Sequence, residues 1–170
     1  MLTREDWTRA TGAPPAVRGL VWFRDESKLR EGTGAVVYVQ SVRRRLSFSL
    51  GRYATVFQAE IYAILVCAHE IQSQNRSEKY VNICSDAQAA LKALKAVRRT
   101  TRLVHQCHKA LNDISTRHVA GLLWVRGHAG VRGNEIADEL ARGPSALRFL
   151  ATEPALGSLG ETYKKGSFAG

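Results

Sequence analysis

The 170-residue sequence lacks any apolar run close to the roughly 20 residues that a membrane-spanning helix needs. Its N-terminal segment also lacks the apolar core of a signal peptide, so we expect an intracellular protein, nuclear or cytoplasmic, and not a secreted one. Cysteine is scarce as well: Cys67, Cys84 and Cys107 are odd in number and have no zinc-type spacing. This usage predicts reduced, partly buried thiols rather than a disulfide framework.

Acidic residues are few, with 15 Asp and Glu against 25 Lys and Arg, which gives a formal net charge of +10. The basic residues cluster at 43–45 and again between Lys92 and Arg102. A basic face of this kind suits a polyanion, most often nucleic acid, although basic surfaces also serve solubility. Charge therefore favours a nucleic-acid partner without identifying its type.

Hydrophobic periodicity and turn residues divide the chain into a leader at 1–17, one folded domain at 18–143 and a loose tail at 144–170, with no internal repeat. The spacing predicts strands over 18–25, 32–41, 43–51, 79–85 and 119–127, and helices over 55–73, 86–97, 101–115 and 134–142. Three strands precede the first helix, and helices and strands alternate after it. This order predicts an α/β fold with a five-stranded mixed sheet, its first three strands antiparallel, flanked by helices.

Glu60 occupies an unusual position in the first predicted helix. Its neighbours at i±3 and i±4 are all apolar, so the carboxylate belongs to a face that should be buried. These neighbours are Val56, Phe57, Ala63 and Ile64. Either the side chain reaches water from the edge of that face, or a basic partner or a metal ion compensates its charge.

Three other carboxylates lie at positions where α/β proteins build sites. Asp25 and Asp86 each follow an apolar strand, and the carboxyl ends of strands commonly line such sites. Asp138 lies one turn into the last predicted helix. Each has an ordinary alternative: a turn residue for Asp25, a helix N-cap for Asp86, and a surface pair with Arg142 for Asp138.

One explanation covers the four carboxylates together. If they converge, their mutual repulsion requires divalent cations, and hard oxygen ligands favour Mg²⁺ or Mn²⁺. Two such ions can activate a water and stabilise the leaving oxygen in phosphodiester cleavage. A basic surface around an acidic pocket fits that substrate, because phosphates bind the rim while the metals invert the charge at the centre.

The segments "WFRDESK", "FQAEIYAIL", "CSDAQAAL" and "WVRGHAGVRGNEIADELAR" resemble type 1 ribonuclease H, most closely the domain carried by insect non-LTR retrotransposon polyproteins. The resemblance covers about residues 18 to 143. It implies a ribonuclease H-like fold and endonucleolytic hydrolysis of the RNA strand of RNA–DNA hybrids with two Mg²⁺ ions, Mn²⁺ being an alternative. It also implies that a reverse transcriptase domain normally precedes this one in the same polyprotein. The lack of a long apolar run predicts no membrane partner.

The resemblance assigns roles to particular residues. Asp25, Glu60, Asp86 and Asp138 match the metal-binding quartet, and His128 matches a loop histidine that assists protonation or product departure. The positions implied to bind nucleic acid are Ser27, Gln88 and Asn134. In the basic segment, Lys92, Lys95, Arg98 and Arg99, with Arg102 beside them, are candidates for electrostatic docking; a solvated helix face is the alternative.

One departure from the family pattern leaves a second function open. The family usually has Thr-Asp-Gly-Ser at the first carboxylate, whereas this chain has Arg24, Asp25, Glu26 and Ser27. Glycine there permits close approach to nucleic acid, and Glu26 adds bulk and negative charge. The alternative is therefore a weakened or inactive nucleic-acid-binding module of the same fold. A polynucleotidyl transferase of the integrase type is disfavoured by the loop "GHAGVRGNEIAD".

Overall fold

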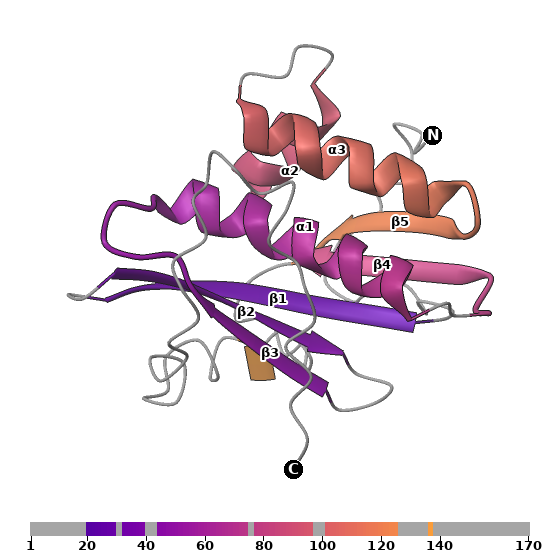
Figure 1. Ribbon diagram of the computed structural model, residues 1–170, viewed down its shortest axis with the longest axis horizontal. Helices are drawn as coiled ribbons and strands as arrows, with labels where there is room; N and C mark the ends of the chain where they lie inside the picture. The colour runs from indigo at the N-terminus through magenta and orange to yellow at the C-terminus, as the bar shows by residue number, and fades with distance from the viewer. Residues whose placement is uncertain are drawn as a thin grey trace.

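The computed structural model describes residues 20–29, 32–39, 44–74, 77–96, 101–125 and 136–137. These form five strands and three helices, with a further helical pair at 136–137 (Figure 1). The elements are β1 (Leu20–Leu29), β2 (Gly32–Val39), β3 (Arg44–Ser49), α1 (Val56–Ser73), β4 (Tyr80–Ser85), α2 (Gln88–Lys95), α3 (Arg102–Ser115) and β5 (Val119–Trp124). The predicted leader, the tail and most of the last helix lie outside the described residues.

The five strands form one mixed sheet in the order β3-β2-β1-β4-β5. β1, β2 and β3 pair antiparallel, while β4 runs parallel to both β1 and β5. This confirms the predicted fold class. The short links among the first three strands permit antiparallel pairing, and the helices between β3, β4 and β5 supply the crossovers that parallel pairing needs.

The predicted end of the first strand is wrong. β1 continues beyond Asp25 to Leu29, because its pairing with β2 runs without a break from Trp22 opposite Val39 to Leu29 opposite Gly32. Asp25 thus lies inside a strand, and its interpretation as a turn residue is also wrong. The strand persists through Glu26, which pairs with Ala35.

α1 begins where the sequence predicts, because Thr55 caps it. The Thr55 hydroxyl accepts a hydrogen bond from the Gln58 amide at 3.1 Å, and the Gln58 side chain accepts one from the Thr55 amide at 2.8 Å. Such a reciprocal capping box satisfies amides that the first helical turn leaves unpaired. The helix is then fixed at its start and runs 18 residues across the sheet.

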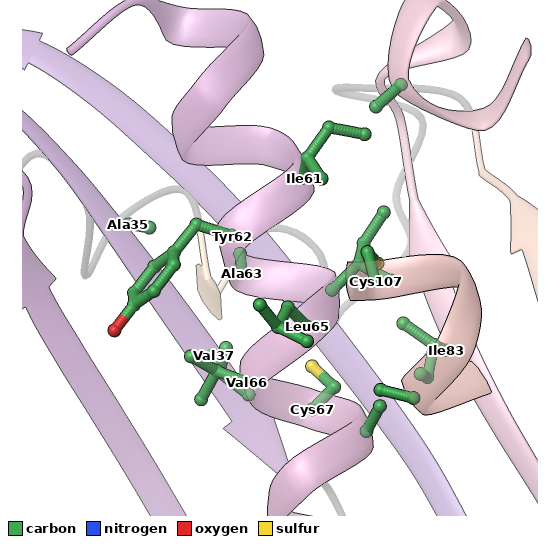
Figure 2. Close-up of a cluster of buried hydrophobic side chains, with 14 of the residues drawn as sticks. Ala35, Val37, Ile61, Tyr62, Ala63, Leu65, Val66, Cys67, Ile83 and Cys107 are labelled. Carbon is green, nitrogen blue, oxygen red and sulfur yellow. The ribbon is translucent and has the colours of Figure 1, made fainter. Parts of the chain in front are cut away.

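The main core lies between the sheet and the three helices, which occupy the same side of it (Figure 1). Figure 2 shows α1 side chains such as Leu65 and Val66 packed among Val37 of β2 and Ile83 of β4. Each fully buried aliphatic side chain contributes about 1.5–3 kcal/mol. Cys67 and Cys107 belong to this core, and all three cysteines are buried and outside any disulfide, which confirms the expectation of reduced thiols.

A smaller cluster covers the other face of the sheet. Tyr38, Cys84 and Val125 pack there with Ala137, which is fully buried. The 136–137 segment, orange in Figure 1, lies on the side of the sheet away from α1, α2 and α3. Burial raises the pKa of the Cys84 thiol to about 12, so at neutral pH this side chain stays protonated and acts as a packing residue.

Across the described ranges, no helix is both long enough and apolar enough to cross a bilayer.

Candidate active site

Asp25 and Asp86 lie at the same level of neighbouring strands. The parallel register of β1 and β4 places Phe23 beside Cys84, and each aspartate follows its strand's paired residue by two positions. Adjacent strands are about 4.8 Å apart, so the two backbones are close at this level. The side chain of Asp25 lies outside the described residues. The backbone alone brings these two carboxylate-bearing positions together.

Asp86 is held by β5. The indole Nε1 of Trp124 donates a hydrogen bond to the Asp86 carbonyl oxygen at 3.1 Å, and the Val125 amide donates to the Ser85 carbonyl at 2.9 Å. Asp86 itself is half-buried and follows β4 directly. The N-cap of α2 is Ala87, so the alternative of Asp86 as the N-cap is wrong. Asp86 therefore lies between the end of β4 and the N-cap of α2.

Glu60 is buried, with 5 % of its surface exposed. The alternative that its carboxylate reaches water is therefore wrong. Among the described residues none donates a hydrogen bond to its Oε2 atom, although the residue as a whole is not without an interaction. A carboxylate in such a position stands in a low-dielectric setting, where compensation of its charge is worth most.

The start of α1 is anchored at the carboxyl end of β1. The Thr33 hydroxyl donates a hydrogen bond to the Ala54 carbonyl at 2.7 Å, and Thr33 pairs with Lys28 of β1. From this anchor, Glu60 lies about 7 Å along the helix axis and Asp25 about 10 Å back along the strand. α1 packs against β1 and runs from this end of β1 back along the sheet (Figure 1). Two positions at similar distances from the anchor therefore lie at a similar level.

Five predicted site residues lie outside the described residues: Arg98, Arg99, His128, Asn134 and Asp138. Ala137, the residue before Asp138, is described. Ala137 packs against Cys84 and Val125, close to the ends of β4 and β5. The chain therefore reaches the level of Asp86 one residue before Asp138, from the face opposite Glu60.

The predicted nucleic-acid contacts are described only in part. Gln88, Lys92 and Lys95 on α2 are exposed, as is Arg102 at the start of α3, which is compatible with both docking and a solvated face. The backbone of Ser27 pairs with Gly34, but its side chain lies outside the described residues, as do Arg98 and Arg99.

The donor set fits a hard divalent cation. Carboxylate oxygens are ligands that Mg²⁺ and Mn²⁺ prefer, and the four candidates carry no nitrogen or sulfur donor among them. Within the described ranges no group of three or more His, Cys, Asp or Glu side chains converges. The side chains of Asp25 and Asp138 lie outside those ranges, so the quartet as a whole stays a prediction.

Three residues at this end of the sheet were not predicted from the sequence. Trp124 supports the Asp86 backbone, and its position at the end of an apolar strand was the available signal. Arg52 and Tyr53 are exposed in the turn before α1, where an aromatic residue between Gly51 and Thr55 was the signal.

Comparisons with known proteins all point to one family. The family model for RNase H matches residues 18–145. A ribonuclease H of Aromatoleum aromaticum is 54 % identical over 41 residues, which cover 24 % of this chain and 27 % of that protein. A ribonuclease H of Vibrio vulnificus is 56 % identical over 34 residues, covering 20 % and 22 % respectively. These matches span about a quarter of the length of the curated relatives.

Proposed function

This chain belongs to the RNase H family, and on that premise we propose that it hydrolyses the RNA strand of RNA–DNA hybrids with the help of divalent metal ions. The observation that carries the proposal is Glu60, a carboxylate with 5 % exposure at the level where Asp25 and Asp86 lie on neighbouring strands. Such a placement of acids is costly in a protein that only binds a polyanion. It is useful where cations must be held beside a phosphate.

Asp25, Glu60, Asp86 and Asp138 would hold two Mg²⁺ or Mn²⁺ ions. When bound, the ions would supply an activated water and stabilise the departing 3′-oxygen. The chain contributes rigidity: Trp124 fixes the Asp86 backbone, and the capped start of α1 fixes Glu60. His128 would assist protonation or departure of the product, in line with the family resemblance.

Selection of a hybrid would rest on shape and charge rather than on base sequence. Contacts to the 2′-hydroxyls distinguish RNA from DNA, whereas phosphate contacts position a strand without specifying it. The net charge of +10 supports this mode. The contacts would come from Ser27, Gln88, Lys92, Lys95, Arg98, Arg99 and Asn134.

The setting of the domain is also part of the proposal. The match over residues 18–145 supports a domain at 18–143 with a leader and a tail outside it. The resemblance of the motif segments to insect retrotransposon polyproteins supports a role in reverse transcription, beside a reverse transcriptase domain and inside the cell.

A labelled RNA–DNA hybrid incubated with Mg²⁺ tests the proposed activity. We expect cleavage of the RNA strand by the native chain and loss of cleavage in Asp86→Asn, which keeps the size of the side chain but removes its charge. Circular dichroism of both proteins checks that the substitution preserves the fold. Binding of the hybrid by the native chain without cleavage, in either Mg²⁺ or Mn²⁺, would replace the enzyme by the binding module that Glu26 suggests.

A further inference from the structure

Trp124, the last residue of β5, and Val125 after it hold the two peptide groups that flank Asp86. The Val125 amide donates a hydrogen bond to the Ser85 carbonyl at 2.9 Å, and the indole Nε1 of Trp124 donates one to the Asp86 carbonyl at 3.1 Å. The first bond continues the backbone pairing of β4 with β5, which any residue could make. The second comes from a side chain, so it depends on the identity of residue 124.

The chain changes direction directly after Asp86. Ala87, the N-cap of α2, has an extended backbone, and its amide donates a hydrogen bond to the Ser85 hydroxyl at 3.2 Å. An alanine side chain offers no oxygen with which to cap the helix. The direction of the chain between β4 and α2 therefore depends on the hydrogen bonds to the Ser85 and Asp86 groups, and the direction of the Asp86 side chain depends on it in turn.

The indole N–H of Trp124 is held in place by packing. The Trp124 ring is half-buried and lies against the main core, where Ala87 also packs. A donor that is ordered in this way loses little entropy when it makes its hydrogen bond. Phenylalanine fills most of the same space but has no N–H, so Trp124→Phe removes the hydrogen bond and keeps most of the packing.

Trp22 of β1 provides a matched comparison within the same core. Its ring is fully buried, and its Nε1 has no hydrogen-bond partner in the part of the chain that the structure describes. Like Trp124, it lies close in sequence to a candidate metal ligand, because Asp25 follows it by three residues. Both tryptophans contribute ring packing, and of the two it is Trp124 whose N–H holds the backbone of a candidate ligand.

We propose that Trp124 is a positioning residue for the metal ions: its indole N–H orients Asp86 and so raises the affinity of the site for Mg²⁺. The inference rests on the proposed function, because it takes Asp86 as a metal ligand. Groups that hold a ligand from behind commonly change metal affinity ten- to a hundredfold when they are lost, since the ligand then has to be ordered by the metal itself.

Isothermal titration calorimetry of the full chain with Mg²⁺, without nucleic acid, tests this role. We expect Trp124→Phe to raise the dissociation constant for Mg²⁺ about tenfold, and Trp22→Phe to leave it at the native value. Thermal unfolding in EDTA checks that both variants fold. In cleavage assays, the Mg²⁺ concentration that gives half the maximal rate should rise by the same factor in Trp124→Phe, while KM for the hybrid at saturating Mg²⁺ stays native.

A second measurement removes the N–H without changing the size of the ring. Replacement of tryptophan by 3-benzothienylalanine exchanges the indole N–H for sulfur. The sequence has three tryptophans, so in a chain with Trp7→Phe and Trp22→Phe the replacement alters Trp124 alone. We expect the same rise in the Mg²⁺ dissociation constant, relative to that chain with ordinary tryptophan, and this comparison decides the question if Trp124→Phe fails to fold.

The outcomes separate this inference from the proposed function. Native Mg²⁺ affinity in the folded Trp124→Phe chain would overturn the inference and leave the proposed function intact. An equal loss of affinity in Trp22→Phe would also overturn it, because ring packing would then explain the effect. If the native chain binds Mg²⁺ more tightly than Trp124→Phe but cleaves no hybrid, the positioning role stands and the proposed catalysis fails. A native chain that binds no Mg²⁺ would overturn both.

Discussion

Two glutamates in the same helix are equally buried but lie at opposite ends of it. Glu60 and Glu70 lie ten residues apart in α1, and each is 5 % exposed. The Glu70 side chain has a partner from its own helix, because Gln74 Nε2 donates a hydrogen bond to its Oε2 at 2.8 Å. Glu60 lies at the other end of the helix, level with Asp25 and Asp86.

The two ends of the sheet also differ in the polar groups that they carry. At the amino ends of β4 and β5, His118 donates from Nδ1 to the Glu78 carbonyl at 2.7 Å, and Arg117 donates to the Gln72 carbonyl of α1 at 3.5 Å. These polar groups satisfy one another within the fold. At the carboxyl ends, the register of β1 and β4 instead places the backbones of Asp25 and Asp86 on neighbouring strands. The difference teaches that the location of a buried charge, and what lies around it, decides its role.

The largest expected effect is a loss of hybrid cleavage on substitution of Glu60, and substitution of Glu70 should not cause it. Glu60→Gln should reduce hybrid cleavage by at least about a hundredfold, since loss of a direct metal ligand should exceed the ten- to hundredfold typical of outer partners. Glu70→Gln should keep near-native cleavage. Initial rates at saturating Mg²⁺ measure both. Equal losses in the two variants would remove the distinction drawn between the ends of α1.

His118→Ala tests the opposite end of the sheet, at the amino ends of β4 and β5. We expect it to lower the free energy of unfolding by about 1–3 kcal/mol, because the Glu78 carbonyl loses a buried donor. Urea denaturation measures this change, and kcat for the folded protein should stay unchanged. A fall in kcat at full folding would mean that this end contributes to the reaction.

Metal binding should stabilise the folded chain, and this stabilisation should depend on Glu60 but not on Glu70. Mg²⁺ at ten times its dissociation constant should stabilise the native chain by about 1.4 kcal/mol, since a ligand that binds the folded state shifts the equilibrium. Thermal unfolding should show a rise of a few degrees in Tm for the native chain and for Glu70→Gln. The same rise in Glu60→Gln would show that Glu60 does not hold the metal.

The smallest expected effect concerns Glu26. Glu26→Gly should raise cleavage a few-fold, because it removes bulk and negative charge where the nucleic acid approaches the backbone. Glu31→Gly is a control for loss of a negative charge nearby in the sequence. Equal turnover by Glu26→Gly and the native chain would show that this departure from the family pattern is harmless.

The sequence predicted much of the fold because its signals are local. Alternating and helical periodicities placed every described strand and helix within a few residues. The capping box of Thr55 and Gln58 at the start of α1 was not predicted. Its errors were at element ends. β1 runs on past Asp25 because β2 offers it a partner, and no local pattern contains that pairing.

What the sequence by itself determined is the identity of the unusual residues: a carboxylate among apolar neighbours at Glu60 and acids after apolar strands. Their chemistry follows from residue type and spacing, which are local. Only the tertiary structure decided that Glu60 is buried, that Asp25 and Asp86 share one level, and that Tyr53 faces water near them. Strand register and helix docking join residues far apart in the chain, so no stretch of sequence could specify them on its own.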